Sequence, residues 1–162
     1  MKEITLRGKW GIGSVALIDD DDFDKVSKKK WYVTINGYPK NGKEKLYLHK
    51  FIIKCPKGKF VDHINHNLLD NRKCNLRITT PQQSSCNIRT RNRTLPYRGI
   101  SYSYAYNKNG QKHIRKNPYL VQLGVHPKQK FVGYFDNPLH AAMAYDIWAK
   151  EWYGEYANLN FP

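Results

Sequence analysis

Short runs of β-branched, aromatic and alternating polar residues, separated by glycines, fill the first part of the chain. They predict strands at residues 4–6, 14–18 and 31–35, and the Asn36-Gly37 pair predicts a tight turn. The acidic run at residues 19–24 predicts a solvated helix start, because carboxylates favour the positive end of the helix dipole. We therefore expect residues 1–46 to form a small β-rich platform.

The pattern in residues 47–95 predicts two strands followed by a helix. Residues 60–64 and 75–79 have strand-like composition, and Thr80 and Pro81 then supply an N-cap and a first-turn proline. The first of these strands carries Asp62 and His63 side by side. Adjacent side chains of a regular strand diverge, so both could serve one site only at a strand end or a bulge.

The last part of the chain, residues 96–162, has its own pattern. Three strands are predicted at residues 100–106, 119–125 and 130–136, joined by a loop at 107–117 and a His126-Pro127 turn. Asn137 and Pro138 then begin a helix that should end at Gly154. Small and aromatic residues recur on it at helical spacing and predict a face packed on the sheet: Ala141, Tyr145, Trp148 and Trp152. The predicted class is α+β, with a three-stranded antiparallel sheet on one C-terminal helix.

The excess of basic over acidic residues indicates what kind of molecule the protein binds. The 162 residues carry 28 basic and 13 acidic side chains, a net charge of +15. Such an excess favours a polyanion, and nucleic acid is the commonest one. The excess is densest in residues 47–95, which hold ten basic and two acidic residues, around Asp62 and His63.

Cysteines and apolar runs indicate where the protein works. The three cysteines, Cys55, Cys74 and Cys86, form no C-x-x-C pair, which argues against a disulfide framework or a structural zinc site. Met1 is followed by a polar run without the apolar core of a signal peptide, and no apolar stretch approaches the roughly twenty residues that span a bilayer. We expect a soluble cytoplasmic protein with no membrane partner.

Asp62-His63, Asn75 and the polar helix after Pro81 resemble the HNH family of nucleases, from Leu48 to about Arg93. The resemblance implies a ββα fold around one divalent metal ion, Mg²⁺ or Mn²⁺, and no small-molecule cofactor. It implies that Asp62 binds the metal, that His63 is the general base, and that Asn75 orients the loop and the imidazole. The residue chemistry agrees, because imidazole titrates near neutral pH and a carboxylate is a hard oxygen ligand.

One position departs from the family pattern. The second metal ligand is usually Asn or His on the helix, twenty-one residues after the catalytic His, where this chain has Ser84. Asn87 lies roughly 4.5 Å further along a helix, too far to replace it without rearrangement. A serine hydroxyl coordinates more weakly, so the resemblance implies a naturally weakened enzyme or a deliberate change at Ser84. His49 precedes the motif, where we favour a structural or supporting role over a catalytic one.

Four sequence blocks after the nuclease motif resemble the plant ethylene-response-factor DNA-binding domain, of the APETALA-two type, over residues 97–162: residues 97–100, 132–136, 141–146 and 159–162. The resemblance implies a sheet that lies in the DNA major groove. It implies DNA contacts from Arg98, Gly99, Gln122 and Phe131. Ser101 and Ser103 stand where plant members have arginines, so base specificity does not carry over. Arg115, Lys116 and Lys130 could add phosphate contacts, which position a protein without reading sequence.

Between these two regions runs a basic linker with Arg89, Arg91 and Arg93 at alternate positions. We expect it to cross a phosphate backbone; the alternative is a merely solvated linker.

Together the patterns predict a site-directed DNA endonuclease of the homing type, from a phage or mobile element, acting in a prokaryotic or phage-infected cell. It would work on double-stranded DNA as a monomer or a DNA-induced dimer. The alternative is a catalytically weakened or inactive DNA-binding protein or transcription regulator that retains the nuclease fold. The predicted domains are 1–46, 47–95 and 96–162.

Overall fold

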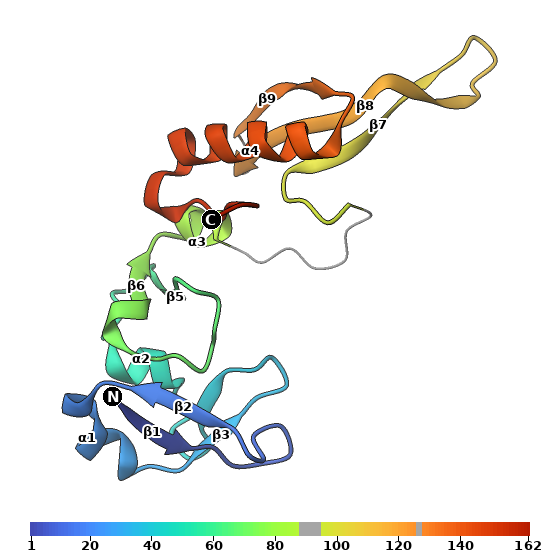
Figure 1. The fold of residues 1–162 in the computed structure, drawn as a ribbon. Coiled ribbons are helices and arrows are strands. Elements are labelled where there is room, and N and C mark those ends of the chain that lie inside the picture. The colour runs from blue at the N-terminus through green and yellow to red at the C-terminus, as the bar shows by residue number, and fades with distance from the viewer. Residues whose placement is uncertain (88–94, 126–127) are drawn as a thin grey trace. The chain divides into compact units, whose positions relative to one another are not determined.

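The computed structural model describes residues 1–87, 95–125 and 128–162 (Figure 1). The chain divides into two compact units, residues 1–81 and 82–162. Each unit has a hydrophobic core of its own. Within the described residues, no helix combines the length and the apolar character needed to cross a bilayer.

The first unit begins with two small antiparallel sheets. β1 (Lys2–Thr5) pairs with β2 (Val15–Ile18), and β3 (Trp31–Val33) pairs with β4 (Pro39–Asn41). Between β3 and β4, Gly37 has a φ of +85° and its N–H donates to the Thr34 carbonyl at 2.8 Å. Glycine adopts this left-handed conformation without strain, so the predicted Asn36-Gly37 turn is confirmed. β4 was not predicted.

The acidic run forms a 3-10 turn, η1 (Asp20–Asp22), followed by α1 (Phe23–Ser27). The prediction of a fully solvated run is wrong for Asp22, which is 1% exposed. Its carboxylate forms ion pairs with Lys25 at 2.5 Å and with Lys73 at 3.2 Å. A buried carboxylate requires such partners, and Lys73 comes from a distant part of the chain that a local pattern does not reveal.

The two strands of the segment that resembles the HNH nucleases occupy the rest of the first unit. α2 (Leu48–Ile52) precedes β5 (Phe60–His63), which pairs antiparallel with β6 (Leu76–Thr79) after the short turn η2 (Lys73–Asn75). Both predicted strands are confirmed. The two small sheets and the motif share one core, in which Ile18, Trp31 and Leu48 are at most 1% exposed. β5 is therefore anchored against the platform that precedes it in sequence.

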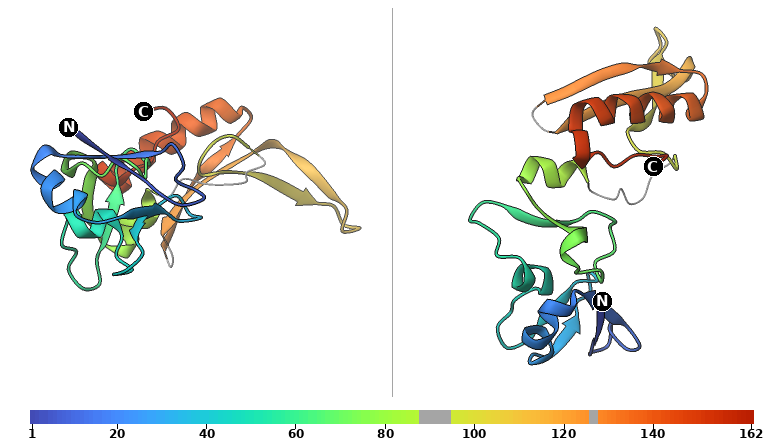
Figure 2. Two further views of the ribbon diagram at one scale, coloured as in Figure 1. Left: turned by 90° about the horizontal axis from the view of Figure 1, so that it is seen from below. Right: turned by 60° about the vertical axis from the view of Figure 1, so that its left-hand side comes forward.

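The second unit contains a three-stranded antiparallel sheet in the order β7-β8-β9. Its strands are β7 (Ile100–Tyr106), β8 (Lys112–Val125) and β9 (Lys128–Phe135). α3 (Pro81–Cys86) starts at the unit boundary, and α4 (Pro138–Tyr153) covers one face of the sheet before η3 (Gly154–Tyr156), as Figures 1 and 2 show. Val121, Leu123, Ala141 and Tyr145 form the centre of this core, so the predicted sheet and helix are confirmed. Trp152, predicted for the packed face, is 39% exposed, so the prediction is wrong for this residue.

β8 is longer than the sequence pattern predicted. The expected loop at residues 107–117 is shorter, because β8 already starts at Lys112. Tyr104 pairs with Ile114 and Tyr102 with Tyr119, so β8 holds three extra residues at this irregularity. Pro118 lies in the irregular part, where its missing N–H interrupts no regular ladder position. The predicted His126-Pro127 turn lies outside the described residues.

Gly99, at the entrance to β7, cannot carry a side chain. Its φ is +72°, and an added Cβ would lie 2.0 Å from Cδ2 of Tyr145. Tyr145 is 3% exposed, and its hydroxyl accepts a hydrogen bond from Arg98 Nε at 2.8 Å, so the ring has little room to move.

We therefore expect Gly99→Ala to destabilise the second unit by about 3 kcal/mol or more, combining backbone strain with overpacking. Gly110→Ala is the matched control, because Gly110 has a φ of +74° with no atom within 4 Å of an added Cβ. The control should lose only about 1–2 kcal/mol, from backbone strain alone. Urea unfolding of both variants measures the two losses in free energy of unfolding. Equal losses would show that the Tyr145 ring moves aside to accommodate the added methyl group.

Candidate active site around His63

His63 is the last residue of β5, and its imidazole is buried, with 3% exposed. Its Nε2 lies 3.4 Å from Oδ1 of Asn71. The amide nitrogen of Asn71 donates to the Leu68 carbonyl at 3.1 Å, which directs Oδ1 of this fully buried residue toward the imidazole. An oxygen can only accept, so Nε2 carries the proton and the lone pair of the neutral ring is on Nδ1.

Burial also sets the charge state of this imidazole. Removal from water lowers the pKa of His63 below its ordinary value, and this outweighs the hydrogen bond to Asn71 and the charges of Asp62 and Asp70, which raise it. His63 is therefore neutral at pH 7. A neutral imidazole is the form that can accept a proton, as the predicted role of general base requires.

Aromatic rings pack around His63. The His49 ring meets the His63 ring edge to face at 5.3 Å between centroids, and Tyr38 lies 6.1 Å from His63. Tyr47 stacks on His49 at 5.6 Å and 14°. His49 is 5% exposed, and within the described part of the chain its Nδ1 has no hydrogen-bond partner. These contacts fit a structural or supporting role for His49, which packs against His63.

Burial lowers the pKa of His49 to about 3, with smaller contributions from the charges of His63 and Lys50. In the unfolded chain the pKa returns to about 6.5, so the unfolded state takes up a proton below this pH and the folded state does not. The stabilising effect of a neutral His49 is therefore complete above pH 6.5 and is lost as the pH falls. We expect this residue alone to reduce the free energy of unfolding by about 3 kcal/mol between pH 6.5 and pH 4.

Urea unfolding at several pH values tests this expectation, with His49→Gln, which removes the titrating group. The variant should be less stable at pH 7 but lose about 3 kcal/mol less on acidification than the parent. His113→Gln, at an exposed position on β8, is the control for the substitution itself and should keep the parental free energy of unfolding at pH 7. Identical slopes for His49→Gln and the parent would mean that His49 is not held neutral.

Asp62 faces away from this ring cluster. It stands opposite Arg77 in the β5–β6 ladder, and its Oδ2 accepts hydrogen bonds from Arg77 Nε at 3.2 Å and Nη2 at 3.1 Å. β5 is regular through Asp62 and His63, so their side chains project to opposite faces. The register shows no bulge between Asp62 and His63, but His63 is the last residue of β5, so convergence of the two side chains at the strand end stays a prediction.

The donor set at this site fits a divalent ion only in part. Among the described residues, no three His, Cys, Asp or Glu side chains gather as a metal site would require. Asp70 is 2% exposed, and its carboxylate accepts two hydrogen bonds of 2.7 Å from the Arg72 guanidinium. Its oxygens are therefore used within the protein and do not offer a site for a metal ion. Asp62 is the hard oxygen ligand that remains, and it would have to exchange Arg77 for the ion.

Asn75 closes the connection between β5 and β6. Its amide nitrogen donates to the Asp70 carbonyl at 2.8 Å, and its Oδ1 accepts from the Asn65 N–H at 3.0 Å. Its backbone carbonyl accepts from the N–H of Ile64 at 2.9 Å. Asn75 therefore bonds the loop after His63, and its predicted role in orienting the imidazole stays a prediction. Asn71 is the partner of the imidazole that sequence reasoning missed, although it lies in the same polar segment.

Ser84, the predicted second metal ligand, lies on α3 and is half-buried. It belongs to the second unit, whereas Asp62 and His63 belong to the first, so its role as a ligand stays a prediction. Asn87, the other candidate, is buried, and its N–H donates to the Ser84 carbonyl at 3.2 Å.

Several predicted DNA contacts gather on the sheet face that α4 leaves open. Gln122 is exposed opposite Phe131, which is 55% exposed and lies 5.2 Å from the ring of Tyr134. The Arg115 guanidinium lies over Tyr134 at 5.3 Å. We call these four residues the open sheet face. Tyr134, which was not among the predicted DNA contacts, pairs with Leu120 in the β8–β9 register.

Other predicted contacts have partners inside the second unit. Arg98 donates to the Tyr145 hydroxyl and to the Cys86 carbonyl, each at 2.8 Å. Gly99 gives room to Tyr145, and Lys130 Nζ lies 3.6 Å from the ring centroid of Trp148 on α4. DNA contacts from these three residues stay predictions. Arg89, Arg91 and Arg93 lie outside the described residues.

β5 ends in the buried, hydrogen-bonded His63, pairs antiparallel with β6 and is followed in sequence by the short polar helix α3, which is the element order of the ββα nucleases. The family model described as HNH endonuclease matches residues 54–85. A protein of Acanthamoeba polyphaga mimivirus, named as an uncharacterized HNH endonuclease, is 37% identical over 166 aligned positions, 96% of this chain and 79% of the viral protein. The chain belongs to the HNH endonuclease family.

A second relative is the SPbeta prophage protein YosQ of Bacillus subtilis (strain 168), whose name places it among HNH homing endonucleases. It is 33% identical over 88 positions, which cover 47% of this chain and 50% of the prophage protein. No solved structure matches this chain.

Proposed function

We propose that this chain is a site-directed DNA endonuclease of the homing type, which hydrolyses phosphodiester bonds in double-stranded DNA with His63 as general base. The observation that supports this most is the neutral His63 imidazole, fixed by Asn71 at the end of β5 in the segment that matches the HNH family. Relatives from a giant virus and a prophage support a viral or mobile-element origin.

In this proposal His63 takes a proton from the attacking water. The hydrogen bond from Nε2 to Asn71 keeps the second nitrogen, Nδ1, unprotonated until the reaction. The imidazolium that then forms is favoured by the nearby charges of Asp62 and Asp70, which already act to raise the pKa of His63. The buried ring must become accessible to water for this step, and the loop that Asn75 holds is the segment directly after it.

A divalent ion, Mg²⁺ or Mn²⁺, would supply electrostatic stabilisation of the phosphate when bound. Asp62 would hold it once Arg77 releases the carboxylate, and Ser84 is the proposed weaker ligand from the helix. Asp62 is the only carboxylate proposed to bind the ion, and it is paired with Arg77. Mg²⁺ requires near-octahedral oxygen ligation, so water and DNA phosphate oxygens would have to supply the other ligands. We therefore expect weak metal affinity without DNA.

The second unit would bind the target DNA. Its sheet-and-helix architecture and four sequence blocks support the resemblance to the ethylene-response-factor domain. The open sheet face offers one guanidinium, one amide and two aromatic rings, groups that contact phosphates, base edges and the thymine methyl group. The ring of Tyr134 holds the Arg115 guanidinium in place on this face.

The competing function is a DNA-binding protein with little or no catalysis. Two observations favour it: Ser84 stands at the usual Asn or His position, and the Asp62 carboxylate is paired with Arg77.

Ser84→Asn separates the two functions. The asparagine side chain reaches further than serine, and its amide oxygen is a better metal ligand than a hydroxyl. We therefore expect the cleavage rate of the variant to rise by about tenfold or more at a fixed metal concentration. DNA affinity and cleavage position should not change. Single-turnover time courses on one duplex at several magnesium concentrations make the comparison. Ser85→Asn, on the next residue of α3, is the matched control. An unchanged or slower rate for Ser84→Asn would show that Ser84 is not the weakened ligand.

A further inference from the structure

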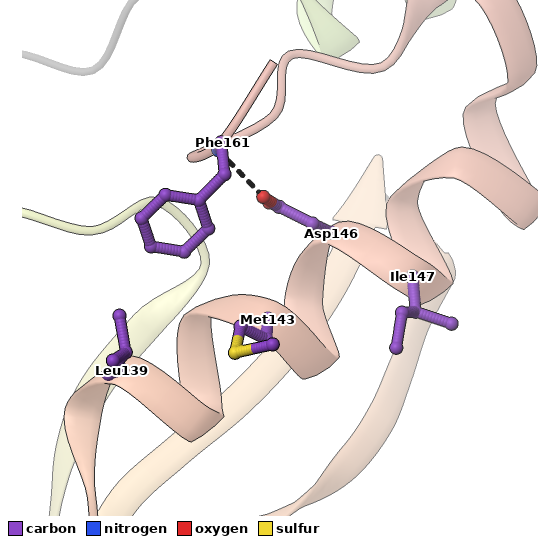
Figure 3. A pocket seen from close by; sticks show the side chains of 5 residues that line it. All are labelled: Leu139, Met143, Asp146, Ile147 and Phe161. Atoms are coloured by element: carbon purple, nitrogen blue, oxygen red, sulfur yellow. Dashed lines mark hydrogen bonds between the residues drawn. The ribbon is translucent and has the colours of Figure 1, made fainter.

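The face of α4 that points away from the sheet carries an apolar stripe. Leu139, Met143 and Ile147 follow one another at four-residue spacing and are 44%, 52% and 66% exposed (Figure 3). The opposite face of the same helix packs its residues into the core, with Ala141 and Tyr145 at most 3% exposed. The helix therefore has two apolar faces, and the fold uses one of them.

The chain terminus extends this stripe. The N–H of Phe161 donates to Asp146 Oδ2 at 2.8 Å, which holds the Phe161 ring beside the helix (Figure 3). Phe161 is 46% exposed, and with the stripe and Asp146 it lines an open hollow of about 350 Å³. We call Leu139, Met143, Ile147 and Phe161 the α4 patch. Contiguous exposed apolar surface of this kind marks interaction sites, because its hydration is unfavourable.

The charges at the two ends of the patch indicate its partner. Exposed Asp136 lies just before the N-terminus of α4, and exposed Lys150 lies near its C-terminus. If a second α4 packs antiparallel with Met143 facing Met143, Leu139 of each copy faces Ile147 of the other. Asp136, which lies two residues before α4, is then at the same end of the interface as Lys150 of the other copy, at both ends. Antiparallel helix dipoles add to this complementarity.

We propose that the α4 patch binds the same patch of a second copy of this chain, forming a two-fold symmetric dimer. Such an interface is isologous, so each contact occurs twice. The antiparallel arrangement with Met143 facing Met143 meets this condition for both the apolar and the charged positions. A duplex has two strands, and a single nuclease site cuts one strand at a time, so a dimer would present one site for each strand.

One helix face is small compared with the standard protein interface of about 800 Å² per partner, so the dimer should be weak in free solution. The net charge of +15 on each copy also opposes association, and salt screens this repulsion. We expect self-association that becomes visible at about 10–100 µM protein and strengthens when salt increases.

Sedimentation velocity of the full chain without DNA or metal tests the proposal, from about 5 to 500 µM. The parental chain should shift from monomer to dimer, and Met143→Glu should stay monomeric over this range. Ile12→Glu is the matched control, because Ile12 is 85% exposed in the first unit, and it should dimerise like the parent. Circular dichroism confirms that each variant is folded. A parental chain that stays monomeric throughout would overturn the proposal.

Charge exchange tests the geometry. Asp136→Lys and Lys150→Glu should each weaken the dimer at least about tenfold, because like charges then face each other at both ends. The double variant restores opposite charges across the two-fold axis and should recover the parental dissociation constant. Failure of the double variant to recover, or loss of dimer in Ile12→Glu, would overturn the antiparallel arrangement. Neither measurement depends on catalysis, so the result is independent of the proposed nuclease function.

Discussion

Replacement of His63 by alanine is expected to lower the single-turnover rate of DNA cleavage by about 10²–10⁴, to the point where cleavage is no longer detected. The structure gives this residue a lone pair on Nδ1, a partner for Nε2 and a lowered pKa, which together suit proton transfer and not DNA binding. DNA affinity should therefore stay within a few fold of the parental value. Single-turnover assays on one duplex, with affinity measured in parallel, make the comparison.

Two further variants make the result specific to the base. Asn71→Leu removes the acceptor for Nε2 while keeping similar bulk, so it should reduce the rate less than His63→Ala does. His113→Ala, at an exposed position on β8, should leave the rate unchanged. Cleavage by His63→Ala at the parental rate would refute the assignment of the base.

Salt is expected to weaken DNA binding strongly. Neutralising phosphates releases condensed counterions, with a log-log slope of about −0.9 per phosphate on duplex DNA. The net charge of +15, with Arg89, Arg91 and Arg93 close together in sequence, predicts a slope of magnitude at least about four. Affinity should therefore fall at least about 250-fold between roughly 50 and 200 mM salt.

Variants assign the slope to particular residues. Arg115→Gln should reduce its magnitude by about one, and joint replacement of Arg89, Arg91 and Arg93 by glutamine by about three. Lys25→Gln is a control, because Lys25 is paired with the buried Asp22. An affinity that stays flat over this salt range would contradict the electrostatic account of binding.

The elements around the site could be predicted because their signals are local. Short β-rich runs predict the strands β5 and β6. The start of α4 is predicted by Asn137 and the Pro138 that follows it, and Oδ1 of Asn137 accepts from the Leu139 N–H at 2.8 Å. The Asp62-His63 pair and Asn75 lie in a spacing that is specific enough to suggest the family. None of these inferences required knowledge of distant contacts.

The interactions that tune the site could not be predicted, because they depend on register and loop conformation. Arg77 pairs with Asp62 only because the β5–β6 register places them opposite each other, fifteen residues apart. Asn71 reaches His63 because its amide is fixed by the Leu68 carbonyl. The cluster of His49 with Tyr38 and Tyr47 is brought together by the core of the first unit. Arg98 resembled a DNA contact in sequence, yet its guanidinium has partners inside the fold.

The most direct test of the nuclease account is to incubate the parental chain and Ser84→Asn with DNA that flanks its own coding sequence, with and without magnesium, and to map new ends on both strands. The account predicts magnesium-dependent ends at one defined position, more abundant with Ser84→Asn and absent with His63→Ala. DNA that is bound by the parental chain and by Ser84→Asn but remains intact with both would contradict it.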